Sequence, residues 1–290
     1  MTTRFASVIA FIAFMAVMAL PVVAAAQAAA PPGPPDVSNL KNYLPITRPA
    51  NLKPSAVPDL SGDWGAGAGG FGQSLSAADP GGRMRGKEAD IKYLPWGLQT
   101  TLAAIPPTGP DAQYELTTDP QMHYCEPHGV GRIYMHPIKS RYVQTPEAVY
   151  ILHEMGPVFR VVWMNANHPE DPDPQPWGHS IGWYENGDTL VVDTVGYNDR
   201  SWLDQVGHPH TEKLHTIERY KKTGADTMEY DITVDDPGAY AAPWPGHRNF
   251  VKSTTGFMRY MWVCSVRDNN AHYEKTFAPS NAGGTTTFGK

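Results

Sequence analysis

The order of hydrophobic and polar positions predicts β-strands over most of the chain beyond residue 140. Short runs rich in β-branched and aromatic residues alternate with turns, a pattern typical of half-buried strands. The one helix expected after the N-terminal segment covers about residues 94–105. Strands are expected at residues 141–145, 148–154, 158–164, 179–185, 188–194, 212–221, 227–235, 257–267 and 272–277.

The clearest local signal is a hairpin around Asn186 and Gly187. An Asn-Gly pair between two strand-like runs favours a two-residue type I′ turn, because both central residues need a positive φ. In that register Glu185 faces Asp188, and paired residues share a face of the sheet. One face then carries Ile181, Trp183, Leu190 and Val192, and the other carries Ser180, Gly182, Tyr184, Val191 and Asp193.

About nine strands joined mostly by short turns predict a mainly β protein. We expect an antiparallel up-and-down barrel, lipocalin-like in pattern, because closure removes the unpaired strand edges. A two-sheet sandwich or an open twisted sheet is the alternative. The expected organisation is a signal peptide at 1–26, a Pro/Ala-rich linker at 27–58, and one barrel domain at 59–290 with an irregular N-terminal portion.

The N-terminal segment has the three parts of a secretory signal: a basic start with Arg4, an apolar run over about 5–23, and small residues up to 26. Since no second apolar run is long enough to span a bilayer, we expect a periplasmic or secreted protein without a membrane partner after cleavage. In an oxidising compartment the only two cysteines, Cys125 and Cys264, are expected to form a disulfide. Two free buried thiols are the alternative.

Composition narrows the function classes further. The net charge is −6 and no basic block occurs, which argues against a nucleic-acid partner. The 8 tryptophans and 14 tyrosines, with 27 glycines and 28 prolines spread along the chain, indicate an aromatic β protein with many loops. There is no glycine-rich phosphate loop between a strand and a helix and no Gly-x-Ser-x-Gly motif, so we expect no cofactor.

The densest polar cluster lies at residues 207–219, with three histidines and two glutamates. If 212–221 is a strand, its period of two puts His215, Ile217 and Arg219 on one face and Glu218 on the other. One of these faces must look into the barrel, so an ionisable group is expected inside it.

Three interpretations of this cluster stay open. In the first, the His208-Pro209-His210 segment with His215 binds a metal ion, although no recognised ligand spacing supports it and we assign no metal ligand. In the second, His210, His215 or Glu218 performs general acid–base chemistry with Asp193 as the orienting group. In the third, Glu218 pairs with Arg219 or Arg160 inside the barrel and has a structural role.

Aromatic residues are the expected ligand-binding groups. Three tryptophans, Trp177, Trp202 and Trp244, fall in predicted loops, where flat rings can cap a pocket at a barrel mouth. The histidines outside the cluster, at positions 136, 153, 179 and 247, are interpreted as isolated surface or satisfied side chains. The candidate ligand-binding residues are Trp177, Trp183, Tyr184, Trp202, Arg219 and Trp244.

Several motifs resemble those of a large group of exported, mostly uncharacterised bacterial proteins. They are Cys125-x-Pro-x-Gly, residues 177–182 (Trp-Gly-His-Ser-Ile-Gly), residues 188–194 (Asp-Thr-Leu-Val-Val-Asp-Thr), 202–204 (Trp-Leu-Asp), Pro209-His210, His215-x-x-Glu218-Arg219 and 235–237 (Asp-Asp-Pro). The resemblance covers about residues 59–290 and implies export and a lipocalin-like (calycin) barrel, but no particular reaction. Members usually have Glu-Gly-Asp at the hairpin, and this chain is one residue longer there.

The leading hypothesis is an exported β-barrel that binds a small hydrophobic or aromatic molecule. Conversion of that molecule by proton-transfer chemistry of the lyase, isomerase or hydrolase type would use His210, His215, Glu218 and Asp193. A non-catalytic ligand-binding or envelope protein and a metal-dependent hydrolase are the alternatives. The sequence leaves open whether the protein is an enzyme, what its substrate is, and its oligomeric state.

Overall fold

The structure is a computed structural model, and it describes residues 58–66, 74–78, 88–104, 119–155, 158–257 and 264–265. The predicted signal peptide and all of the predicted linker except Pro58 lie outside the described residues. The strand predicted at 272–277 also lies outside them, as does most of the one predicted at 257–267. The predicted signal peptide, linker and last two strands therefore stay predictions.

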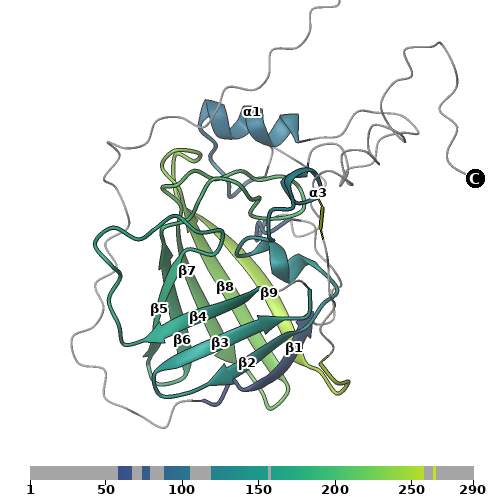
Figure 1. The fold of residues 1–290 in the computed structure, drawn as a ribbon, viewed down its shortest axis with the longest axis vertical. Coiled ribbons are helices and arrows are strands. Elements are labelled where there is room, and N and C mark those ends of the chain that lie inside the picture. The colour runs from purple at the N-terminus through teal and green to yellow at the C-terminus, as the bar shows by residue number, and fades with distance from the viewer. Residues whose placement is uncertain are drawn as a thin grey trace, which may run out of the picture. The chain divides into compact units, whose positions relative to one another are not determined.

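Nine strands form a closed barrel in chain order, and β1 closes it by pairing with both β2 and β9 (Figure 1). The prediction of a mainly β barrel is confirmed. The strands are β1 (Gly62–Ala66), β2 (Ser140–Gln144), β3 (Ala148–His153), β4 (Phe159–Met164), β5 (His179–Glu185), β6 (Thr189–Val195), β7 (His215–Lys222), β8 (Thr227–Asp235) and β9 (Trp244–Lys252).

The barrel is mixed rather than purely antiparallel, which corrects the up-and-down prediction. Strands β4 and β5 run parallel, with Val162 opposite Ser180 and Trp163 opposite Ile181. A parallel pair needs a crossover of a dozen or more residues. The Pro- and acid-rich loop at 165–178 has this length and returns the chain to the end of the barrel from which β4 started.

Strands β1 and β9 were not predicted. In β9 the run Trp244-Pro245-Gly246 contains the two residues that most weaken a strand signal. Placing Trp244 in a loop was wrong, because Trp244 is the first residue of β9, lies opposite Val234 and is fully buried.

The predicted register of the β5–β6 hairpin is wrong by one residue. The loop has three residues rather than two: Glu185 pairs with Thr189, and the amide of Asp188 donates to the Glu185 carbonyl at 3.2 Å. Asn186 and Gly187 do have the positive φ values expected of them, 53° and 77°. The slip changes which residues share a face. Ile181 now lies opposite Asp193, Trp183 opposite Val191, Gly182 opposite Val192 and Tyr184 opposite Leu190.

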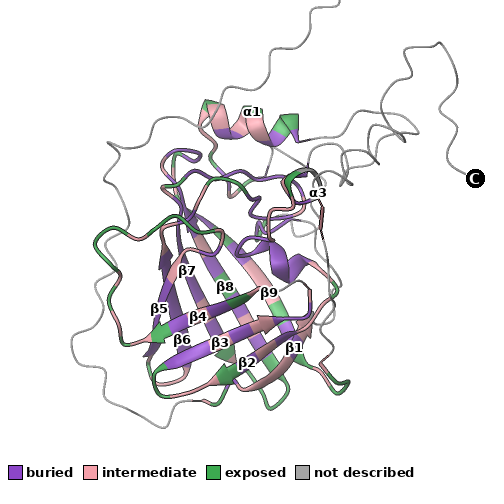
Figure 2. Cartoon of the chain, in the orientation of Figure 1, coloured by how far each residue is buried: buried purple, intermediate pink, exposed green. Residues whose placement is uncertain are grey.

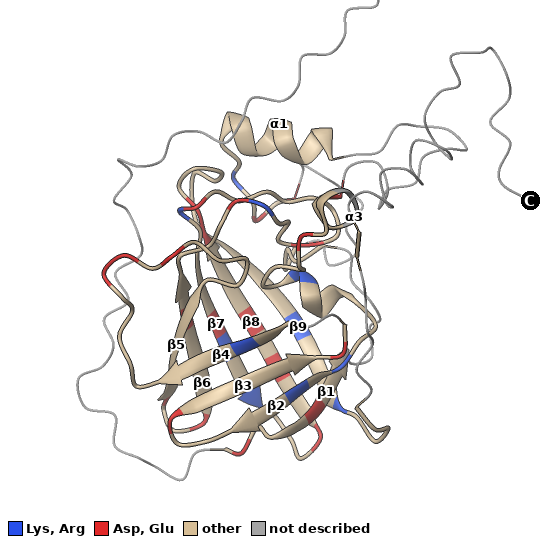
Figure 3. Ribbon diagram, viewed as in Figure 1, with Lys and Arg blue, Asp and Glu red and all other residues tan. Residues whose placement is uncertain are grey.

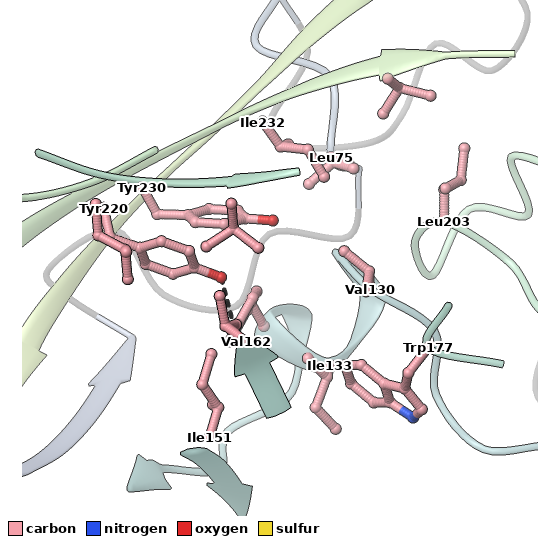
Figure 4. Packing of buried hydrophobic residues seen from close by; sticks show 14 of the residues in the cluster. Leu75, Val130, Ile133, Ile151, Val162, Trp177, Leu203, Tyr220, Tyr230 and Ile232 are labelled. Atoms are coloured by element: carbon pink, nitrogen blue, oxygen red, sulfur yellow. Dashed lines mark hydrogen bonds between the residues drawn. The ribbon is translucent and has the colours of Figure 1, made fainter. Parts of the chain in front are cut away.

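Buried positions run along the strands of the barrel (Figure 2), and aromatic and aliphatic side chains pack together in its core (Figure 4). Tyr142, Tyr220 and Tyr230 are at most 1 % exposed. Within this packing the guanidinium of Arg160, the one basic residue of β4 (Figure 3), pairs with the Glu218 carboxylate of β7. The predicted structural pairing of Glu218 with Arg160 is therefore confirmed, and the alternative partner Arg219 pairs with Glu185 instead.

Helices and loops pack at one end of the barrel. The predicted helix is present as α1 (Pro95–Ala103), and it is anchored by the Leu94 amide, which donates to the Ala239 carbonyl at 2.9 Å. At Gly97 a Cβ atom would lie 2.2 Å from the same carbonyl oxygen, so only glycine permits this approach. The short helices α3 (Pro120–Tyr124) and η1 (Arg132–Met135) precede β2.

Cys125, directly after α3, and Cys264 form a disulfide that closes a segment of 139 residues, as predicted. None of the helices within the described ranges is long and apolar enough to span a bilayer.

Removing this disulfide is expected to lower the free energy of unfolding by about 2–4 kcal/mol, because it restricts the unfolded chain. The test is chemical denaturation of the wild type and of the double variant Cys125→Ser/Cys264→Ser in urea. Equal midpoints and slopes for the two proteins would show that the bond adds no stability.

Candidate functional site

Two histidines and one aspartate lie close together on the outward face of β5, β6 and β7. With the observed register, His179, Asp193 and His215 all lie on this face, at the end of the barrel where β5 and β7 begin and β6 ends. Asp193 lies opposite both Ile181 and Ile217, so His179 and His215 are its diagonal neighbours on the two flanking strands. Three strands therefore bring three ionisable side chains to one place.

The loop between β4 and β5 adds a fourth group, His168. Its Nε2 lies 3.4 Å from Asp193 Oδ1, and its Nδ1 lies 2.9 Å from Nδ1 of His179. On the other side, His215 Nε2 lies 2.8 Å from the same Asp193 oxygen. We call His168, His179, Asp193 and His215 the outer histidine cluster.

An ionised carboxylate only accepts hydrogen bonds, so Asp193 determines which ring nitrogens in the cluster carry a proton. Burial alone would raise the pKa of Asp193, but hydrogen bonds from His168 and His215 hold it below its usual value. An ionised Asp193 accepts from both Nε2 atoms, so each of these nitrogens carries a proton. In a neutral His168, Nδ1 is then the acceptor for a proton on His179 Nδ1, which leaves the lone pair of His179 on Nε2.

This arrangement forms a proton path of His179, His168 and Asp193. When His179 Nε2 takes up a proton, its Nδ1 proton can pass to His168, and Asp193 stabilises the imidazolium that results. Burial and the neighbouring His168 lower the pKa of His179, so its imidazole is neutral near pH 7. His168 keeps 18 % of its side chain exposed, so solvent reaches the cluster.

Apolar side chains surround the cluster on the same face of the sheet. Ile181, Trp183, Val191 and Ile217 form a hydrophobic group separate from the main core, and Ala166 of the β4–β5 loop packs against it. These four side chains are buried, so the Asp–His path borders a packed apolar group. Apolar side chains beside a few polar groups are typical of sites for molecules with an apolar body.

The predicted catalytic residues divide between three places. Asp193 and His215 lie together in the outer histidine cluster. Glu218 lies on the opposite face of β7, inside the barrel, where Arg160 and the hydroxyls of Tyr220 and Tyr230 bond to it. His210 lies in the β6–β7 loop, and its Nε2 is 3.0 Å from Ser201 Oγ.

The predicted ligand-binding aromatics are dispersed, and most are buried. Trp183 borders the outer histidine cluster, whereas Tyr184 faces inward and donates to Gln144 at 3.0 Å. Trp177 stacks on His153 with ring centroids 5.1 Å apart, and Trp202 lies beneath the Arg132 guanidinium. Together with the fully buried Trp244, these tryptophans are parts of the packed interior rather than an exposed rim.

The three histidines of the proposed metal interpretation bond to different partners. His208 forms a fully buried ion pair with Asp204 (2.5 Å) and also contacts Glu88, and these carboxylates raise its pKa to about 9 despite its burial. His210 and His215 bond to Ser201 and Asp193. Within the described ranges no group of three or more His, Cys, Asp or Glu side chains is arranged to hold a metal ion.

Sequence reasoning missed two members of the outer histidine cluster. The interpretation of His179 as isolated is wrong, since it contacts His168. The alternation of His179 with Ile181 on one strand, combined with a three-residue hairpin loop, would have placed His179 beside Asp193. Nothing in the local pattern marked His168, which lies in an irregular loop.

Comparison with known proteins finds no family model that matches this chain and no curated protein that matches it.

Proposed function

We propose that this chain is an exported β-barrel protein that binds a small hydrophobic or aromatic molecule and exchanges a proton with it at the outer histidine cluster. The observation that carries the proposal is the hydrogen bonding of both His168 and His215 to one Asp193 oxygen, with His179 at the end of the path. Histidine is the side chain that both gives and takes protons near pH 7.

Export is supported by two features. The disulfide between Cys125 and Cys264 is of a kind that persists in oxidising compartments. The N-terminal pattern of a basic residue, an apolar run and small residues is typical of a secretory signal. The periplasm or the cell exterior is therefore the proposed location, in agreement with the resemblance to exported bacterial proteins.

The reaction class follows from the groups present in the outer histidine cluster. An ionised carboxylate, two imidazoles bonded to it and a third imidazole with an available lone pair suit removal of a proton and its return. This is the chemistry of an isomerase, a lyase or a hydrolase. The apolar neighbours Trp183, Ile181 and Ile217 would hold the rest of the substrate.

The first experiment is a thermal-shift search with a panel of aromatic and terpenoid alcohols, ketones and esters. A ligand at 100 times its dissociation constant stabilises the folded state by about 2.7 kcal/mol. Each compound that shifts the melting temperature is then incubated with the protein, and its conversion is followed by mass spectrometry or, for isomers, by chromatography.

Asp193→Asn is expected to lower kcat/KM for such a compound by about 10²–10⁴-fold, because the amide cannot stabilise the imidazolium of His168. The matched control is Asp231→Asn, which changes an exposed Asp–His pair (His247 Nδ1 to Asp231 Oδ1, 2.7 Å) on the same outward surface. The control is expected to retain wild-type turnover. Equal turnover by the wild type and by folded Asp193→Asn would contradict the proposal, whereas compounds that bind but are not converted by the wild type would favour a non-catalytic binding protein.

A further inference from the structure

A second pair of chemically complementary side chains lies in the loop between β6 and β7. Ser201 Oγ is 3.0 Å from His210 Nε2, and His210 Nδ1 is 3.3 Å from the carbonyl oxygen of Thr211. A carbonyl oxygen only accepts, so Nδ1 carries the proton and Nε2 accepts from the serine hydroxyl. This is the arrangement of a nucleophile, its general base and a group that orients the base.

The surroundings favour the tautomer and charge state that this chemistry needs. Burial lowers the pKa of His210, so its imidazole is neutral and able to take a proton near pH 7. The orienting carbonyl is held in place by Asp236, whose carboxylate accepts from the amide and the hydroxyl of Thr211 at 2.5 and 2.8 Å. Asp236 thus acts through the Thr211 backbone and does not contact the imidazole by a hydrogen bond in this arrangement.

The lack of a side chain at Gly129 leaves room for the Ser201 hydroxyl. A Cβ atom at Gly129 would lie 2.6 Å from Ser201 Oγ and 3.4 Å from the Trp202 carbonyl oxygen. Any other residue at position 129 would therefore press on the hydroxyl. Ser201 and His210 are both buried, with 6 % and 2 % of their surface exposed, so the pair lies just beneath the surface of this loop region.

We propose that Ser201 is the nucleophile, and His210 the general base, of a second site that hydrolyses small carboxylic esters. This site uses no residue of the outer histidine cluster, so it is independent of the function proposed above. The chemical class of substrate follows from the pair itself, because a serine activated by a neutral imidazole attacks acyl carbon.

The reaction balances with water as the second reactant. Ser201 Oγ bonds to the ester carbonyl carbon while its proton passes to His210 Nε2. The bond from carbon to the alcohol oxygen breaks, and the alcohol leaves with that proton. Water then attacks the acyl-serine and gives a proton to His210, the bond to Ser201 Oγ breaks, and the serine recovers the proton as the carboxylic acid departs.

The test is labelling of the whole protein with a fluorophosphonate, which phosphonylates an activated serine with loss of fluoride. The expected result is one adduct per chain, mapped to Ser201 by peptide mass spectrometry in the wild type. Ser201→Ala should carry no adduct, and His210→Gln should react at least 100-fold more slowly. Ser253→Ala, which changes a half-buried serine outside the site, is the matched control and should label at the wild-type rate.

Wild-type mapping keeps the test independent of whether any variant folds. A wild-type protein that gives no more adduct than Ser201→Ala, or an adduct on a different serine, would overturn the proposal. Labelling of Ser201 at the same rate in the unfolded and the folded wild type would overturn the proposal as well, because it would show that His210 does not activate Ser201 in the folded protein.

Discussion

Glu218→Ala is expected to lower the free energy of unfolding by about 3–5 kcal/mol, because it leaves the guanidinium of Arg160 buried without its counter-charge. Arg160 is 2 % exposed and Glu218 is fully buried. Arg160 also donates to Ser180 Oγ at 2.9 Å and to Thr194 Oγ1 at 2.7 Å. The side chains of Arg160 and Glu218 are both shielded from bulk solvent, so the remaining charge stays in the packed interior.

The neighbouring residue on β7 offers a matched control. Arg219 points outward and pairs with Glu185, and both side chains are about two-fifths exposed (41 % and 42 %). Arg219→Gln is expected to change the free energy of unfolding by less than about 1 kcal/mol. Urea denaturation of both variants measures the difference, and equal effects would contradict the assignment of Glu218 to the barrel interior.

A double variant separates the cost of a lone charge from the value of the pair. Arg160→Met/Glu218→Leu removes both charges and keeps similar volume. Replacing a whole buried pair by apolar groups is often nearly neutral, so the double variant should lose less stability than Glu218→Ala alone. A larger loss in the double variant would show that the pair itself, with its hydroxyl partners, stabilises the barrel.

Acidification from pH 6.5 to pH 4 is expected to lower the free energy of unfolding, and His136 and His153 together account for about 5 kcal/mol of the loss. Burial lowers the pKa of His136 to about 4 and that of His153 to about 3, and it holds the pKa of His128 well below its usual value. A histidine whose folded-state pKa is depressed binds protons first in the unfolded state, below pH 6.5. Its contribution to stability is complete above that pH and falls as the pH decreases.

Thermal or urea denaturation at half-unit pH intervals measures this slope. His136→Gln should flatten it, because glutamine does not titrate, whereas His247→Gln at an exposed position should leave it unchanged. A slope that is the same in both variants would show that His136 does not contribute to the loss of stability in acid.

The opposite trend is expected at high pH because of His208. Its pKa is raised to about 9, so its contribution to the free energy of unfolding is complete below pH 6.5 and is lost as the pH rises through 9. Urea denaturation between pH 6.5 and pH 10 measures this loss.

Much of the barrel was predictable from the sequence because strand patterns are local. The runs that became β2 to β8 each carry β-branched and aromatic residues between turn residues, and their bounds agree with the prediction within a few residues. Strand β9 was missed because Pro245 and Gly246 mask its pattern. The parallel pairing of β4 and β5 depends on the path of the 165–178 loop, which local patterns do not determine.

The candidate site was only partly predictable, and one turn accounts for much of the difference. Reading the β5–β6 loop as two residues placed Asp193 on the face of Ser180 and away from Ile181. The third loop residue, Asp188, is held by a hydrogen bond from Thr189 Oγ1 at 2.7 Å, and it moves Asp193 to the outward face. The alternation along β7 was predicted correctly, so His215 and Glu218 were rightly assigned to opposite faces.

The most direct test of the outer histidine cluster as the functional site uses nuclear magnetic resonance of protein with ¹⁵N-labelled imidazoles. The chain has 11 histidines, and substitution of single histidines by glutamine assigns their signals. A compound that raises the melting temperature in the aromatic and terpenoid panel is titrated into this sample. We predict that it shifts the signals of His168, His179 and His215 and leaves those of the buried His136 and His153 in place. If a compound without an ester group binds and is converted while the three outer signals stay unchanged, the account is contradicted.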